Sequence, residues 1–152
     1  MYVGINTRAR NMVAHNAARA YAQIGIETGV AAASPHRMIM MLYDGAILAI
    51  ADATGHLAAQ RIPQKGQAIS RAISIIDEGL RSSLDLRRGG KIASDLERLY
   101  DYMNRRLLLA SVRNEAGGLT EVSGLLRELR DAWAEIADKA DVQPALAQQV
   151  AA

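Results

Sequence analysis

Four long stretches of the chain repeat apolar residues every three or four positions, and this helical period constrains the fold more than any other feature. We expect helices at about 35–59, 64–86, 91–116 and 120–140. Helices of this length joined by short links pack as antiparallel neighbours. The sequence therefore predicts an all-α protein built as an antiparallel four-helix bundle.

The boundaries of these helices follow from local signals. Ser34 is a good N-cap, and Pro35 suits the first helical position, where no backbone N–H is needed. The pairs Gly89-Gly90 and Gly117-Gly118 are expected to end the second and third helices. Pro63 is expected to begin the second helix after a break at Arg61.

Each predicted helix has an apolar face that we expect to form the core. On the first helix this face is Ile39, Leu42, Ala46, Ala49 and Ala53, with a second apolar stripe at Met40, Tyr43, Ile47 and Ile50 beside it. The third helix contributes Ile92, Leu96, Leu99, Tyr100, Met103, Leu107 and Ala110, and the fourth contributes Val122, Leu125, Leu126, Leu129, Trp133 and Ile136. The single indole, Trp133, is expected to fill the core.

The two ends of the chain differ from this pattern. Residues 1–33 are expected to form an N-terminal arm, partly disordered and with a short helix near its middle. Residues 34–140 form the predicted helical bundle, and residues 141–152 form a C-terminal tail that is frayed or a short capping turn.

The composition excludes several classes of protein. The chain has no cysteine, which rules out disulfides, zinc–thiolate sites and a cysteine nucleophile. Its 18 basic and 16 acidic residues give a net charge of +2, which is too nearly balanced to favour nucleic-acid binding. The first residues lack the apolar core of a secretory signal, and no stretch approaches the ~18 continuous apolar residues of a membrane span. We expect a cytoplasmic, soluble protein without membrane insertion.

The residues that commonly carry catalysis are not arranged for it. No Glu is followed three positions later by His, so the di-metal motif of helical bundles is missing, and Gly89-Gly90 lacks the Lys-Ser/Thr of a phosphate-binding loop. We expect no enzyme activity, no metal and no cofactor. The three scattered histidines are expected to be structural or on the surface: His15, His36 and His56. Three aspartates beside the apolar faces are expected to cap helices or pair with arginines: Asp44, Asp85 and Asp101.

Several apolar residues fall outside the predicted core faces. They are Met40, Tyr43 and Ile47 on the first helix, Ile75 on the second, and Tyr102, Leu108 and Leu109 on the third. Such a surface, with flexible methionines, suits the apolar face of an amphipathic helix. These residues could equally pack under the N-terminal arm or pair with a second copy of the chain. Periodicity does not separate these three interpretations.

The sequence resembles the FliS-type flagellar secretion chaperones, in order and spacing, from about Ala20 to Ala140. The matching segments are Ala20-Tyr21-Ala22-Gln23-Ile24, Met41-Leu42-Tyr43-Asp44-Gly45-Ala46, Ile75-Ile76-Asp77-Glu78-Gly79-Leu80, Leu99-Tyr100-Asp101-Tyr102-Met103 and Leu129-Arg130-Asp131-Ala132-Trp133. The resemblance implies a helical bundle that binds the C-terminal segment of flagellin in the cytoplasm. It also implies prevention of early polymerisation and delivery of flagellin to the flagellar type III export gate, without catalysis or a cofactor.

The resemblance and the surplus apolar residues together predict a partner-binding surface. In the family, the N-terminal tyrosine motif covers part of the apolar surface until a client or the gate protein binds, and here this motif corresponds to Tyr21, Ile24 and Ile26. The predicted surface consists of Tyr21, Ile24, Ile26, Met40, Tyr43, Ile47, Tyr102 and Leu109. The alternative is a helical homodimer, a structural or adaptor module whose apolar patch pairs with itself.

Overall fold

The computed structural model describes residues 34–137, and within this range every regular element is helical. Its long helices are α2 (Pro35–Ala58), α3 (Ile62–Ser74), α4 (Gly90–Arg113) and α5 (Ala116–Ala137). A π-helical stretch, η1 (Ile75–Leu80), and a 3₁₀ turn, η2 (Arg81–Ser83), extend α3. The all-α prediction is confirmed for the described residues.

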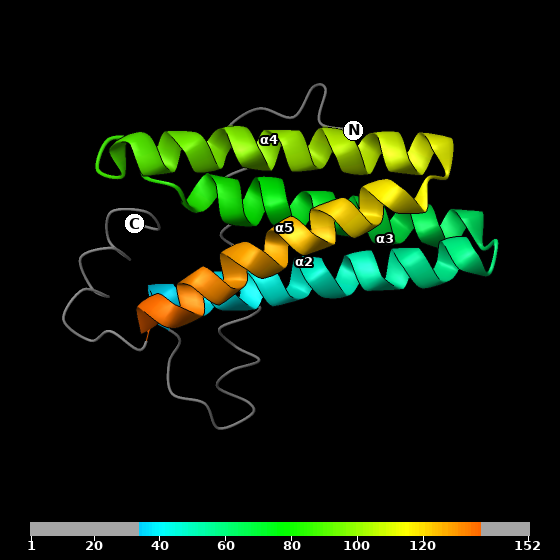
Figure 1. Cartoon of the computed structure of the whole chain (residues 1–152), viewed down its shortest axis with the longest axis horizontal. Helices are drawn as coiled ribbons and strands as arrows, with labels where there is room; N and C mark the ends of the chain where they lie inside the picture. Colours follow the sequence, from blue (N-terminus) through cyan, green and yellow to red (C-terminus); the bar gives the residue numbers. More distant parts are fainter. Residues whose placement is uncertain (1–33, 138–152) are drawn as a thin grey trace.

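The helices pack side by side, and the packing is consistent with a four-helix bundle. Helix α2 contacts both α3 and α5, and α4 also contacts both α3 and α5. In Figure 1, α5 starts beside the end of α4 and runs obliquely to the start of α2. Helix α5 therefore bridges the two helices that are most widely separated in that view.

The start of α2 is the one predicted from the sequence. The Ser34 hydroxyl accepts a hydrogen bond from the Arg37 N–H at 3.2 Å, and Pro35 occupies the first turn. Helix α2 is also long and apolar enough to cross a membrane by length and hydropathy alone. Its buried side chains contact the other helices, so these properties are here those of a core helix.

The second helix ends earlier than predicted. Helical geometry ends at Ser83, because Leu84 adopts an extended backbone, whereas the sequence predicted an end at Leu86. Asp85 then shapes the link to α4, since its carboxylate accepts the N–H groups of Arg87 and Arg88 at 3.1 and 3.0 Å. Gly90, with φ +54°, begins α4.

The third and fourth helices meet at Asn114, and the predicted boundary at Gly117-Gly118 is wrong. Asn114 adopts the left-handed conformation that ends α4, and its side-chain oxygen accepts a hydrogen bond from Lys65 Nζ at 2.8 Å. Asparagine tolerates this backbone better than most residues. The two glycines lie inside α5, where Gly118 allows close contact, since a Cβ there would be 2.9 Å from the Ala110 Cβ.

The core lies between the four helices, and α2 contributes most to it. Both apolar stripes of α2 supply buried residues, because α3 covers one side of the helix and α5 the other. Trp133 is buried, as predicted. Ile92, predicted to be in the core, is 55% exposed near the start of α4, so this part of the prediction is wrong.

Ion pairs between helices confirm part of the expectation for the three aspartates. Asp44 of α2 pairs with Arg130 of α5. Asp101 of α4 pairs with Arg81 at 3.1 Å, and Arg81 also holds Asp77 at 3.1 Å. Asp85 instead caps the backbone of its own loop.

Candidate functional site

The predicted partner-binding residues fall into three groups in the structure. Tyr21, Ile24 and Ile26 lie outside the described residues. Met40, Tyr43 and Ile47 belong to α2. Tyr102 and Leu109 belong to α4.

Tyr43 is a core residue, and its predicted placement on the open surface is wrong. Its side chain is 0% exposed, and its hydroxyl lies 2.6 Å from that of Tyr100 on α4. Burial raises the pKa of Tyr43 to about 12, although hydrogen bonds to the phenol oppose this shift. Burial also raises the pKa of Tyr100, with the neighbouring Tyr43 as a smaller cause. The two phenols therefore form a neutral polar contact inside the bundle.

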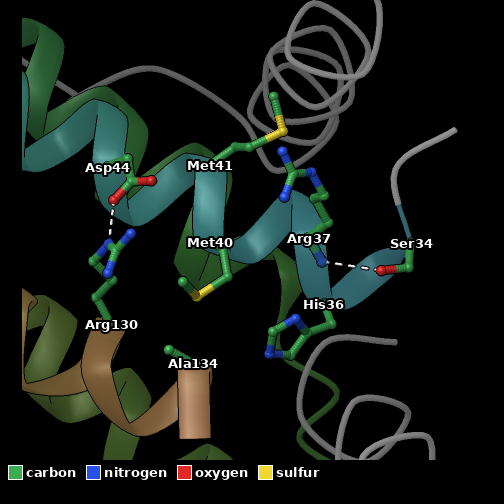
Figure 2. Close-up of a pocket in the computed structure, with 8 residues that line it drawn as sticks. All are labelled: Ser34, His36, Arg37, Met40, Met41, Asp44, Arg130 and Ala134. Carbon is green, nitrogen blue, oxygen red and sulfur yellow. Dashed lines mark hydrogen bonds and ion pairs between the residues drawn. The ribbon is translucent and has the colours of Figure 1, made fainter. Parts of the chain in front are cut away.

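Met40 and Ile47 are half-buried and pack against the edge of the core. Met40 lies opposite Arg130 and Ala134 of α5, as Figure 2 shows. Part of each side chain remains accessible, so both can contact the core and a partner. Ile75, by contrast, is buried in η1, and its predicted exposure is wrong.

The exposed part of the predicted surface lies on α4. Tyr102 is 37% exposed, and Leu108 and Leu109 are 46% and 39% exposed. The exposure predicted for these three side chains is confirmed.

Tyr102 is held in place by a contact between α4 and α5. Its hydroxyl donates to one oxygen of Glu121, and the Arg106 Nε donates to the other oxygen at 2.7 Å. The bond from Tyr102, followed by that from Arg106, lowers the pKa of Glu121. The Glu121 carboxylate on α5 therefore joins two side chains of α4. The aromatic ring of Tyr102 is thereby oriented beside α5.

Further exposed apolar residues were not predicted. Leu48 on α2 and Val112 on α4 are 63% and 73% exposed. Leu48 directly follows Ile47, and Val112 lies one helical turn beyond Leu108 and Leu109. In the sequence, the only signal for their exposure was this proximity to residues of the surplus apolar set, because neither Leu48 nor Val112 completes a stripe of apolar residues along its helix.

A cavity of about 420 Å³ lies where α2 begins and α5 ends (Figure 2). It is lined by Ser34, His36, Arg37, Met40, Met41, Asp44, Arg130 and Ala134. His36 is buried, packs against Trp133 with the ring centroids 5.2 Å apart, and places its Nε2 2.6 Å from the Trp133 carbonyl oxygen. It has the structural role expected of it. Within residues 34–137, no group of three or more His, Cys, Asp or Glu side chains could hold a metal ion.

Comparison with known proteins gives one consistent family. Residues 17–140 match the family model described as flagellar protein FliS. The flagellar secretion chaperone FliS of Salmonella typhimurium is 49% identical over 125 residues, covering 82% of this chain and 93% of that protein. The flagellar secretion chaperone FliSB of Pseudomonas aeruginosa is 44% identical over 122 residues, covering 80% and 96%. FliS of Escherichia coli is 41% identical over 124 residues, covering 82% and 91%.

These matches span all four described helices and confirm the resemblance inferred from the sequence. The chain belongs to the FliS family of flagellar secretion chaperones.

Proposed function

We propose that this protein is a cytosolic, non-enzymatic export chaperone that binds the C-terminal segment of flagellin. Bound in this way, flagellin would be kept from polymerising early and would be delivered to the flagellar type III export gate. The observation that carries the proposal is the match, along the whole helical region, to proteins named flagellar secretion chaperones.

The distribution of accessible apolar residues supports a helical client. Tyr102 and Leu109 are accessible on α4, and Met40 and Ile47 are partly accessible on α2. Helix α5 connects with α4 through Glu121 and with α2 through Arg130. An amphipathic segment that crosses or flanks α5 could contact both groups and bury its own apolar face. Tyr43 does not contact the client directly in this proposal, because its side chain is fully buried.

The energetics of such a complex suit temporary storage. Burying apolar surface contributes about 25 cal/mol per Å². A client that folds as it binds loses conformational entropy, which offsets part of this gain. A long client can therefore be held over a large surface and still be released at the gate. The arm residues Tyr21, Ile24 and Ile26 remain part of the proposal as a cover that the client or the gate protein displaces.

The test is a binding measurement with purified flagellin from the same bacterium. Full-length flagellin should bind, and flagellin without its last ~40 residues, the span of two ordinary helices, should not. Leu109→Gln should weaken binding roughly tenfold, because it removes one apolar contact from the proposed surface. Isothermal titration calorimetry measures both effects.

Val112→Gln is the matched control, because Val112 is also exposed on α4 but is not part of the proposed surface. It should leave the affinity unchanged. Equal binding of full-length and truncated flagellin would refute the proposal. A sedimentation coefficient that rises with the chaperone's own concentration, and does not respond to flagellin, would instead support the homodimeric adaptor.

A further inference from the structure

Tyr102 is an exposed aromatic residue whose polar end is already bound. Its hydroxyl donates a hydrogen bond to the Glu121 carboxylate on α5, and the Arg106 Nε donates to the other oxygen of that carboxylate at 2.7 Å. Tyr102 and Arg106 lie one turn apart on α4, so both reach the carboxylate from the same face of the helix. The phenol is therefore held at its tip, while Tyr102 as a whole remains 37% exposed.

The packing of α5 on α4 fixes the position of Glu121. The neighbouring Val122 is fully buried, so this turn of α5 is anchored in the core. Gly118, one turn earlier, allows a close approach to α4, because an added Cβ there would lie 3.3 Å from the Arg106 carbonyl oxygen. Since Arg106 engages one carboxylate oxygen and Tyr102 the other, the carboxylate cannot turn away without breaking both hydrogen bonds.

The main consequence of this cluster is the restriction of the Tyr102 side chain. The Arg106 and Glu121 side chains are 26% and 38% exposed, and ion pairs that water can reach contribute little to stability. A tyrosine without such a contact moves among rotamers on the helix surface, and a partner that binds its ring must stop this motion. Glu121 restricts the ring before a partner arrives, so part of the entropic cost of binding is removed.

We propose that Glu121 is a positioning residue for client binding, which holds the Tyr102 ring in the orientation that receives the apolar face of the client. The inference rests on the proposed function, in which Tyr102 belongs to the client surface. Because the phenol hydroxyl is already bound to Glu121, the ring presents carbon atoms to the client. This favours an aliphatic client side chain over one that needs a hydrogen-bond partner at that position.

The test measures, by calorimetry, how the full-length chaperone binds a peptide of the last ~40 residues of the bacterium's own flagellin. Glu121→Ala should weaken binding about three- to tenfold, because the freed ring must then be ordered on binding. Tyr102→Phe keeps the ring and removes only its bond to Glu121, so it should weaken binding by a similar factor. Glu128→Ala removes the same charge from an exposed position of α5 outside the cluster and should leave the affinity unchanged.

A double-mutant cycle separates positioning from direct contact. Tyr102→Ala removes the ring, so adding Glu121→Ala to this variant should cause no further loss of affinity. A full additional loss would show that Glu121 acts on the client or on the bundle by itself, and it would overturn the inference. Unchanged affinity of Tyr102→Phe, or an equal loss in Glu128→Ala, would overturn it as well.

The outcomes distinguish this inference from the proposed function. If the unmodified chaperone binds the peptide and Tyr102→Ala binds it equally well, the inference is wrong and the proposed function stands. If the unmodified chaperone binds neither the peptide nor intact flagellin, the proposed function is wrong, and the inference that rests on it is wrong too.

Discussion

At the scale of single residues, the least expected feature is the contact between Tyr43 and Tyr100. Two phenols from α2 and α4 meet at 2.6 Å inside the bundle, where one hydroxyl donates a hydrogen bond to the other. The helical period placed Tyr43 on a surplus stripe and Tyr100 on a core face. Periodicity could not show that the two side chains would reach each other, because 57 positions separate them in the chain.

This pair predicts a loss of stability at alkaline pH. In the unfolded chain a tyrosine loses its proton near pH ~10, whereas burial raises the pKa of folded Tyr43 to about 12. Between these values the folded state binds more protons than the unfolded state, so the free energy of unfolding falls as pH rises. The contribution of the neutral phenol is complete below the unfolded pKa and is lost as pH rises through the folded pKa. We expect Tyr43 alone to account for roughly 1–3 kcal/mol of this fall.

Urea unfolding at about pH 8 and about pH 11 checks this expectation. The double variant Tyr43→Phe/Tyr100→Phe removes both hydroxyls and should be nearly as stable as the original protein at the lower pH. Its loss at the higher pH should be smaller. All other titratable residues, including the buried Lys65, are the same in both proteins. The difference between their losses of stability therefore reports on the two phenols alone. An identical loss in both would refute the assignment.

At the scale of the elements, the contact between α4 and α5 was the part least accessible from the sequence. Glycine pairs commonly end helices, and Gly117-Gly118 was therefore assigned to a loop. In the structure, Asn114 ends α4 with Lys65 bound to its side chain, so the glycines are free to lie within α5. Gly118 then serves close packing, and Arg106 and Tyr102 reach Glu121 one turn further along.

The two glycines give a matched pair of substitutions. Gly118→Ala would place a Cβ 2.9 Å from the Ala110 Cβ and 3.3 Å from the Arg106 carbonyl oxygen, which forces α5 away from α4. We expect a loss of about 1–3 kcal/mol in the free energy of unfolding. Gly117→Ala meets nothing within 4 Å and should be neutral or stabilising by up to ~1 kcal/mol.

Urea denaturation of both variants measures the difference. Similar stability of the two variants would contradict the close approach of α4 and α5. Because the Gly117 control changes the same helix at the neighbouring position, a general effect of alanine on α5 would appear in both.

At the scale of the whole molecule, α2 is the element around which the described helices are organised. It contacts α3 on one side and α5 on the other, and the buried His36 and Tyr43 connect it to α5 and α4. The apolar side chains that remain accessible to solvent therefore lie mainly on α4 and at the edges of this packing. This arrangement fits the proposed function, in which a folded scaffold binds an extended client at its surface without a large rearrangement of its core.

The proposed client folding makes a prediction about the complex. When the chaperone is mixed with the C-terminal flagellin peptide of ~40 residues, the far-UV circular dichroism should show more helix than the sum of the separate spectra. Calorimetry at several temperatures should give a negative heat-capacity change, because apolar surface is buried. A mixture with flagellin lacking that segment is the control and should show neither effect. Binding without any gain of helix would contradict coupled folding of the client.

The sequence by itself determined roughly where the four helices lie, how α2 starts and which side of each helix is apolar, because these properties depend on neighbours three or four positions apart. It also indicated that Asp44 and Asp101 would either cap a helix or pair with an arginine, since carboxylates beside an apolar face need a partner, and in the structure both form ion pairs. Only the tertiary structure decided which apolar residues stay accessible. Tyr43 is buried and Ile92 exposed because exposure depends on how many distant segments cover a helix, and a helical period contains no information about those segments.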